Sequence, residues 1–336
     1  MDLRKRTGLI FGLLAGLVPL LFVADLLVGA VPIPAQVIWQ ALTGGDVEAS
    51  TRMIILDIRL TKAVVALLAG MALSVSGLQM QTLFRNPLAG PYVLGISSGA
   101  SLGVALFILG MPLVGLSGSN LLPTLGIAGS AWLGSALILG IIVSVSHRIK
   151  DIMVILILGM MFSSGVSAVV QILQYLSHEE ALKSFVIWTM GSLGDVTREH
   201  LGLLLPVTVL GLLLAVGSIK PLNLLLLGEQ YARTMGLDIR RSRRMILLST
   251  TLLAGTVTAF CGPIGFIGLA VPHLTRILFR QADHRILLPG AALTGGVVLL
   301  CCDIVSKCWT LPINTITALL GIPIVIWVVI RNQSIV

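Results

Sequence analysis

The amino-acid sequence predicts an all-α protein that crosses a membrane about ten times and has no separate soluble domain. Of its 336 residues, 56% are hydrophobic and only 11% are charged, whereas soluble domains carry about 25% charged residues. The mean hydropathy is +1.04. A membrane-spanning helix needs roughly 20 apolar residues, so this chain has room for about ten. These values exclude a soluble globular protein, which needs a polar surface, and a disordered chain, which is far less apolar.

Charged residues and proline–glycine breaks divide the apolar sequence into the expected helices. The predicted spans are 8–30, 57–83, 93–110, 121–145, 152–174, 200–218, 245–262, 264–281, 286–306 and 311–331. The division between the seventh and eighth spans rests on Gly262-Pro263 alone. Residues 1–336 are therefore predicted to form a single transmembrane domain, and 220–244 is predicted to be a cytoplasmic segment within it.

The first predicted span follows the basic cluster Arg4-Lys5-Arg6. Secretory signal peptides begin similarly, but their apolar core has about 7–15 residues and a small-residue cleavage site follows it. The apolar stretch 8–30 is longer and no such site is recognisable, so we expect it to remain as a span. Most of the 22 lysines and arginines fall on the side of this cluster, which predicts that both termini are cytoplasmic. The basic pI, near 9.8, thus indicates membrane orientation rather than nucleic-acid binding.

The cytoplasmic segment has the sequence KPLNLLLLGEQYARTMGLDIRRSRR at 220–244. A short apolar run closed by Gly228 is followed by one or two helical turns that end at Gly236, the expected left-handed C′ residue. Asp238 is then expected to cap the seventh span. Two short helices with an apolar face would suit docking into a groove of a cytoplasmic partner. The alternative is a basic loop that only obeys the positive-inside rule.

A turn precedes the third span and a stripe of glycines lies in its first half, in FRNPLAGPYVLGISSGASLG at 84–103. Two prolines predict a rigid cytoplasmic turn. Gly95, Gly99 and Gly103 are four residues apart, a spacing that lets helix backbones approach closely. A phosphate-binding loop would require Gly-Lys-Ser/Thr, which does not follow. We therefore expect these glycines to serve helix packing.

The apolar sequence is interrupted again at 262–273, GPIGFIGLAVPH. A broken helix at membrane depth persists only where protein or a cavity satisfies its backbone. His273 lies beside a proline near a helix end and is interpreted as structural rather than as a ligand. Cysteines 261, 301, 302 and 308 form no CxxC pair and are interpreted as small packing residues, so no metal site is predicted.

Few ionisable residues fall inside the predicted spans. Asp303 and Lys307 are four residues apart on one helix face and can neutralise each other. No acidic chain crosses the middle of the bilayer, as a proton-coupled carrier often requires. No Ser/His/Asp or HExxH grouping supports a membrane enzyme. A secondary transporter or a polytopic membrane enzyme without an ATPase partner is nevertheless kept as the alternative function.

Four motifs, in order over nearly the whole chain, resemble the FecCD-type family of ABC importer permeases for iron-siderophore, haem and cobalamin. They are RNPLAGPYVLGISSGASLG at 85–103, LLGEQYARTMGLDIRRSRR at 226–244, GPIGFIGLAVPHLTR at 262–276 and LPINTITALLGIPIVIWVVIR at 311–331. The resemblance implies the type II ABC importer permease fold. It also implies an inner-membrane complex of two permease copies, which we expect to be a homodimer, with two ATP-binding subunits and a periplasmic binding protein. ATP and Mg²⁺ would be held by the partner ATPase, so this chain is expected to bind no cofactor and to be no enzyme.

The resemblance also assigns roles to single residues. Arg59, Lys62 and Lys307 match basic positions that dock the binding protein, although two are lysine where the family often has arginine. Lysine binds a carboxylate as a point charge rather than as a two-pronged fork. Asn86 and Leu88 match the cytoplasmic gate. The residues assigned to ATPase coupling are Leu222, Leu226, Gly228, Glu229, Ala232, Arg233, Gly236, Leu237 and Arg240.

Overall fold

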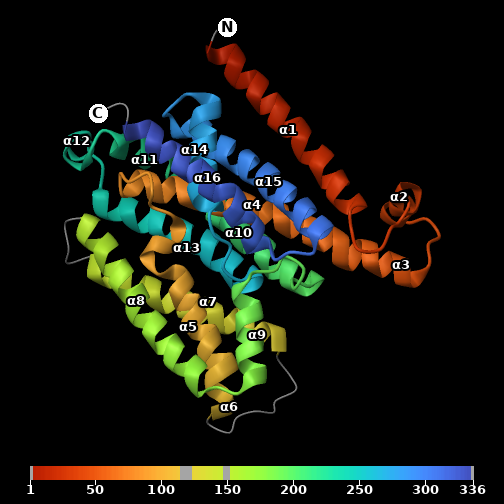
Figure 1. Ribbon diagram of the computed structural model, residues 1–336. Coiled ribbons are helices and arrows are strands. Elements are labelled where there is room, and N and C mark those ends of the chain that lie inside the picture. The colour runs from red at the N-terminus through yellow and green to blue at the C-terminus, as the bar shows by residue number, and fades with distance from the viewer. Residues whose placement is uncertain (1–2, 114–122, 147–151, 334–336) are drawn as a thin grey trace.

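The computed structural model describes residues 3–113, 123–146 and 152–333, and every regular element in those ranges is a helix (Figure 1). The predicted span 121–145 begins two residues before the second range, and charged residues 148, 150 and 151 lie outside the described ranges. Six described helices are long and apolar enough to cross a membrane, and four shorter apolar helices accompany them. In chain order these helices coincide with the ten predicted stretches.

The N-terminal part contains a peripheral helix that packs against α15 and one long continuous helix. α1 (Leu3–Leu27) leads through α2 (Ala35–Thr43) into a helix that runs without a break from Ala49 to Leu83. This long helix consists of α3 (Ala49–Met53), the π-helical segment η1 (Ile54–Leu60) and α4 (Thr61–Leu83). It begins eight residues before the predicted span, because the helix continues through ASTRMIIL at 49–56, which includes the polar residues Ser50, Thr51 and Arg52.

The middle of the chain forms a separate group of helices on one side of α4 (Figure 1). It contains η2 (Pro91–Leu94), α5 (Ile96–Ala105), η3 (Leu106–Gly110), α6 (Met111–Leu113), α7 (Pro123–Ser146), α8 (Ile152–Leu176) and α9 (Glu179–Thr189). Gly95 separates η2 from α5 because its φ of 77° is left-handed. The sequence did not predict α2 or α9, since each is too short to appear as a membrane span.

The C-terminal half contains the remaining helices. They are α10 (Arg198–Gly217), α11 (Ile219–Leu226), α12 (Glu229–Thr234), α13 (Ile239–Cys261), α14 (Ile267–Phe279), α15 (His284–Trp309) and α16 (Ile313–Gln333). α11 and α12 lie where the sequence predicts two short helices. Gly236 follows α12 with a left-handed φ of 82°, and Asp238 caps α13 by accepting from the backbone N–H of Arg241 at 3.0 Å.

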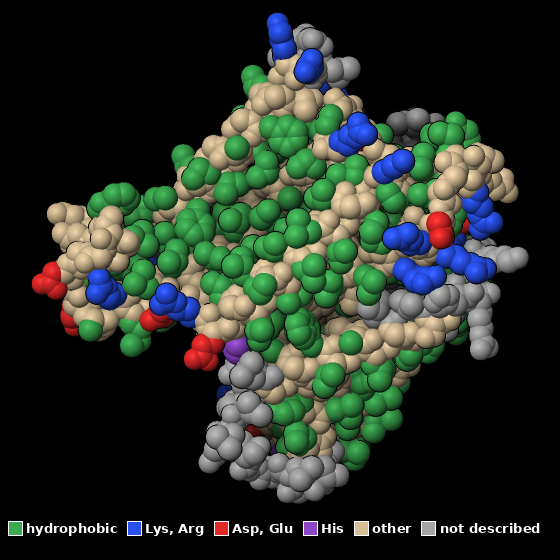
Figure 2. Space-filling view, turned by 180° about the vertical axis from the view of Figure 1, so that it is seen from behind, with side chains coloured by type: hydrophobic (Ala, Val, Ile, Leu, Met, Phe, Trp, Pro, Cys, Tyr) green, Lys and Arg blue, Asp and Glu red, His purple; other side chains and the backbone are tan. Residues whose placement is uncertain are grey.

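α4 is the central helix of the molecule. It packs against α10, α13, α14 and α15. In the most apolar part of the helix Ala49–Leu83, 83% of the residues are buried, compared with 17% in α1. Close backbone contacts make this possible, because a Cβ at Gly77 would lie 1.8 Å from the carbonyl oxygen of Gly268. Figure 2 shows hydrophobic side chains over a broad band, with Lys, Arg, Asp and Glu gathered toward its ends. Such a band matches the hydrocarbon core of a bilayer.

Candidate docking and coupling sites

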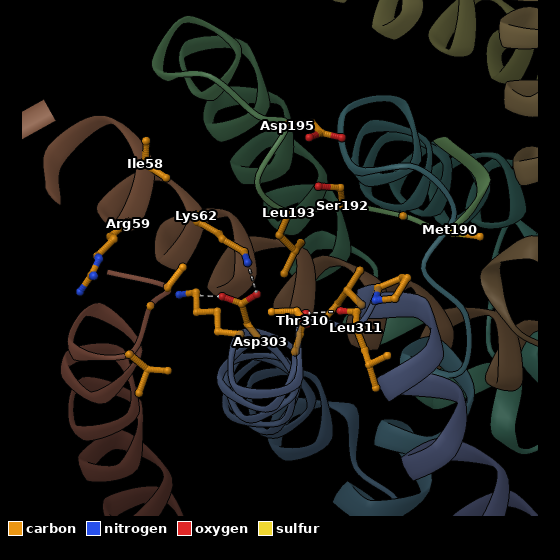
Figure 3. Close-up of a pocket in the computed structure, with 18 of the residues that line it drawn as sticks. Ile58, Arg59, Lys62, Met190, Ser192, Leu193, Asp195, Asp303, Thr310 and Leu311 are labelled. Carbon is orange, nitrogen blue, oxygen red and sulfur yellow. Dashed lines mark hydrogen bonds and ion pairs between the residues drawn. The ribbon is translucent and has the colours of Figure 1, made fainter. Parts of the chain in front are cut away.

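A cavity of about 700 Å³ opens where the N-terminal end of α4 meets the C-terminal end of α15 (Figure 3). Its walls come from the residues after α1, from η1, from the loop after α9 and from the α15–α16 connection. Arg59, Lys62 and Lys307 all line it. The structure thus brings together the three basic residues that the family resemblance assigned to binding-protein docking, although Lys307 is distant in sequence from the other two.

Two buried carboxylates hold two of these basic residues. Lys307 Nζ lies 2.6 Å from Asp25 Oδ2 and 2.9 Å from Asp303 Oδ2, and Lys62 Nζ lies 3.1 Å from Asp303 Oδ1. Asp25 and Asp303 have no exposed surface. A buried carboxylate is costly unless a cation is paired with it. The predicted neutralisation of Asp303 by Lys307 is therefore confirmed, and Asp25 and Lys62 complete a four-residue network that the sequence did not reveal.

Arg59 has a different set of partners. Its guanidinium donates to the carbonyl oxygens of Leu26 at 2.9 Å, Leu27 at 3.3 Å and Val31. These oxygens belong to the C-terminal end of α1 and the residues after it, where a cation is favoured by the exposed carbonyls and the helix dipole. Gly29 leaves room for the guanidinium, because a Cβ there would lie 2.8 Å from Arg59 Nη2. Figure 3 shows Arg59 directed away from Asp303.

The three basic residues differ in how far a partner can reach them. The side chain of Lys62 is 21% exposed and that of Lys307 is 8% exposed, while Arg59 is 5% exposed. Lys62 has one carboxylate partner and lines the open cavity, whereas Lys307 is enclosed by two carboxylates. Their role in docking stays a prediction, and Lys62 is the most accessible of the three.

At the end of α4 opposite this cavity, α11 and α12 expose an apolar surface. Leu222 and Ala232 are fully buried and fix the two helices against the rest of the protein. Glu229 forms an ion pair with Arg243 of α13. Leu226, Arg233, Gly236 and Arg240 are exposed, whereas Gly228 and Leu237 are half-buried. Sequence reasoning missed three exposed apolar side chains of this surface, which are Leu227, Tyr231 and Met235.

The predicted gate turn is held firmly after α4. Asn86 Oδ1 accepts from the backbone N–H of Leu88 at 2.9 Å, and Leu88 itself is exposed. His273 Nε2 lies 2.8 Å from the carbonyl oxygen of Pro87. This contact gives His273 the structural place that the sequence predicts for it, because it ties α14 to the turn.

The three glycines of the stripe meet two different helices. Cβ atoms at Gly99 and Gly103 would lie 2.5 Å from Gly134 O and 1.9 Å from Ser130 O of α7. Gly95 faces α8 instead, where a Cβ would lie 3.0 Å from Ser163 Oγ.

The cysteines are less uniform than predicted. Cys261 and Cys302 are buried and Cys301 is half-buried, but Cys308 is exposed. The packing interpretation is therefore wrong for Cys308, which lies at the C-terminal end of α15 where the helix surface faces away from the core.

Comparison with known proteins agrees with this geometry. The FecCD transport family matches residues 17–331. The hemin transport system permease protein HmuU of Yersinia pestis is 37% identical, with 99% of each chain covered. The vitamin B12 import system permease protein BtuC of Klebsiella pneumoniae is 35% identical, covering 87% of this chain and 86% of the relative. A solved structure of a metal-chelate type ABC transporter in an inward-facing conformation has a TM-score of 0.80 and 31% identity, covering 94% of this chain and 96% of that one. The chain is thus an all-α ABC transporter permease, and it belongs to the FecCD transport family.

Proposed function

We propose that this chain is the membrane permease of an ATP-driven importer that receives a metal chelate from a periplasmic binding protein. The substrate class is an iron-siderophore, haem or cobalamin. The observation that carries the proposal is the full-length match to a hemin permease, together with matches to vitamin B12 permeases. The similar solved transporter supports the same class.

The inner surface of α11 and α12 supports an ATPase partner. Its exposed Leu227, Tyr231 and Met235 would be covered by an apolar groove. The sequence holds no Gly-Lys-Ser/Thr loop for ATP phosphates, so ATP and Mg²⁺ would be bound by that partner and hydrolysed there. Two permeases, two ATPase subunits and one binding protein would form the complex.

The ends of the helices support an inner-membrane orientation with cytoplasmic termini. Arg6, near the start of α1, donates to the carbonyl oxygen of Leu278 at 3.1 Å, and Gln281 donates to Thr7 at 3.2 Å. These contacts place the start of α1 beside the α14–α15 connection. That connection lies at the same end as α11, because Asn223 of α11 contacts Asp283.

Reconstitution tests the proposal. The permease, its candidate ATPase and its candidate binding protein are placed in proteoliposomes with haemin, cyanocobalamin or a ferric hydroxamate siderophore. We expect uptake of one of these to require ATP and the binding protein. Uptake driven by a proton gradient without ATP would support the secondary-transporter alternative. Substrate turnover by the purified chain alone would support the membrane-enzyme alternative.

A further inference from the structure

Asn223 fastens α11 to the first residues of α15. Its Nδ2 donates to Asp283 Oδ1 at 2.6 Å, and its Oδ1 accepts from the backbone N–H of His284 at 2.8 Å. Asp283 also accepts from the backbone N–H of Arg285 at 2.9 Å. The hydrogen bonds from Arg285 and Asn223 lower the pKa of Asp283. The ionised carboxylate thus fixes the orientation of the Asn223 amide, because only the NH₂ side can face it.

His284 carries this connection onward to α4. It is 1% exposed, with Nδ1 at 2.8 Å from Asn223 Oδ1 and Nε2 at 2.8 Å from Thr82 Oγ1. The amide oxygen only accepts, so Nδ1 carries the hydrogen and Nε2 is an acceptor for the Thr82 hydroxyl, whose oxygen also lies 3.0 Å from the carbonyl oxygen of Leu78 within α4. One buried imidazole thereby joins α11 and α4 through its two opposite nitrogens.

A second contact holds the beginning of α11. Gln79 Nε2 of α4 donates to Ser218 Oγ, the residue before α11, at 3.1 Å. Gln79 Oε1 accepts from Ser249 and Thr250 of α13 at 3.1 and 3.2 Å. Gln79 and Thr82 lie about one turn apart on one face of α4. α11 is therefore attached to α4 at its start and, through His284, at its middle.

α4 and α15 are packed closely enough to act as one unit. Cβ atoms at Gly70 and Gly295 would each lie 2.2 Å from the other residue's carbonyl oxygen, and Ser74 Oγ donates to Ala291 O at 2.7 Å. Interfaces with so little free space shift as a whole rather than deforming gradually. A displacement of α11 would thus reach both helices, and the gate turn follows α4 directly.

We propose that Asn223 and His284 are positioning residues that join the coupling segment to the α4–α15 pair, so that movement of the segment reaches the gate turn at Asn86 and Leu88. The inference rests on the proposed function, since it needs an ATPase partner to move α11. Sequence motifs did not single out either residue. We call the hydrogen-bonded residues Asn223, His284 and Thr82 the joint. It lies behind the exposed surface of α11 and α12 and need not touch the ATPase.

The test uses the reconstituted complex with ATPase and binding protein. Thr82→Val removes the hydroxyl that faces His284, and Asn223→Ala removes the amide. Thr294→Val is the matched control, because Thr294 is also buried but its hydroxyl bonds only to Gly290 within α15. We expect substrate transported per ATP hydrolysed to fall roughly fivefold in each joint variant, as for one lost buried hydrogen bond, and to stay unchanged in the control.

The double variant Thr82→Val/Asn223→Ala distinguishes one joint from two independent contacts. Both changes interrupt the same series of hydrogen bonds through His284. The loss of transport per ATP in the double variant should therefore not exceed the larger of the two single losses. Amide hydrogen exchange of residues 84–90 gives a second measurement. We expect ATP with vanadate to change the protection of these amides in the unchanged protein but not in the joint variants. Unchanged coupling in Thr82→Val, a nearly isosteric variant, or multiplied losses in the double variant would overturn the joint. Absence of ATP-dependent uptake by the unchanged complex would count against the proposed function instead.

Discussion

Lys62 and Asp303 form an ion pair, with 3.1 Å between Nζ and Oδ1, that closes one end of the α4–α15 contact. At the other end of the same two helices, Thr82 Oγ1 lies 2.8 Å from His284 Nε2. Between them, α4 and α15 run antiparallel with their backbones in contact. The cavity at Lys62 and the predicted coupling segment are thus connected to opposite ends of one two-helix unit, which gives a physical route between the two predicted partner surfaces.

Replacing Asp303 should destabilise the protein strongly. Asp303→Asn leaves Lys62 without a carboxylate partner and Lys307 with Asp25 alone, and removing one member of a buried ion pair costs about 3 kcal/mol. Thermal unfolding in detergent, followed by circular dichroism, measures the loss. Asp57→Asn is the control, because Asp57 and Arg198 form an exposed pair at 3.7 Å and should contribute little. Equal melting temperatures for the two variants would contradict a stabilising role for the network.

Removing the charge of Lys62 should slow docking of the binding protein. Lys62→Gln keeps Asp303 paired with Lys307, so the fold should persist. Exposed charges mainly steer encounter, and we expect association to slow roughly threefold at low salt. Surface plasmon resonance with the immobilised complex measures this rate.

Lys183→Gln provides the comparison, since it removes an equal charge from an exposed position on α9. High salt should reduce the difference between Lys62→Gln and the unchanged protein. The docking assignment for Lys62 fails if both variants associate at the same rate.

Features that depend on neighbouring residues were predictable from the sequence. The two short helices, the left-handed Gly236 and the Asp303–Lys307 pair each follow from spacings of a few residues. Apolar stretches likewise located the long helices, because each stretch is itself the buried or lipid-facing element. The boundaries differ where a helix continues past polar residues, as the helix containing α4 does at Ser50, Thr51 and Arg52.

Contacts between distant segments were not predictable from this single sequence. Asp25 reaches Lys307 only because α1 packs against α15. Asn223 meets His284 only because α11 lies across the start of α15. Neither pair has a local spacing that would reveal it. The capping of α1 by Arg59 was missed for the same reason. The sequence therefore predicted which basic residues matter, but not the carboxylates and carbonyl oxygens that they contact within the protein.

Adding one methyl group to Gly103 should destabilise the α5–α7 contact. The new Cβ would lie 1.9 Å from Ser130 O, so the two backbones must separate. Overpacking of this kind costs about 2 kcal/mol. Gly129→Ala is the matched control on α7, because no atom lies within 4 Å of its Cβ and alanine favours helix. We expect a lower melting temperature for Gly103→Ala alone, and equal stability of the two variants would contradict the close contact.

Replacing Gly236 should separate ATP hydrolysis from transport. Its φ of 82° is left-handed, and no atom lies within 4 Å of a Cβ there, so only backbone conformation opposes a side chain. A left-handed conformation costs about 1–2 kcal/mol for ordinary residues, and a β-branched residue is the least suited to it. Gly236→Val should therefore shift the end of α12 within the coupling segment and lower substrate transported per ATP in proteoliposomes. Gly236→Asn should retain most coupling, because asparagine tolerates this conformation. Equal coupling in the valine and asparagine variants would show that the left-handed turn does not position the segment.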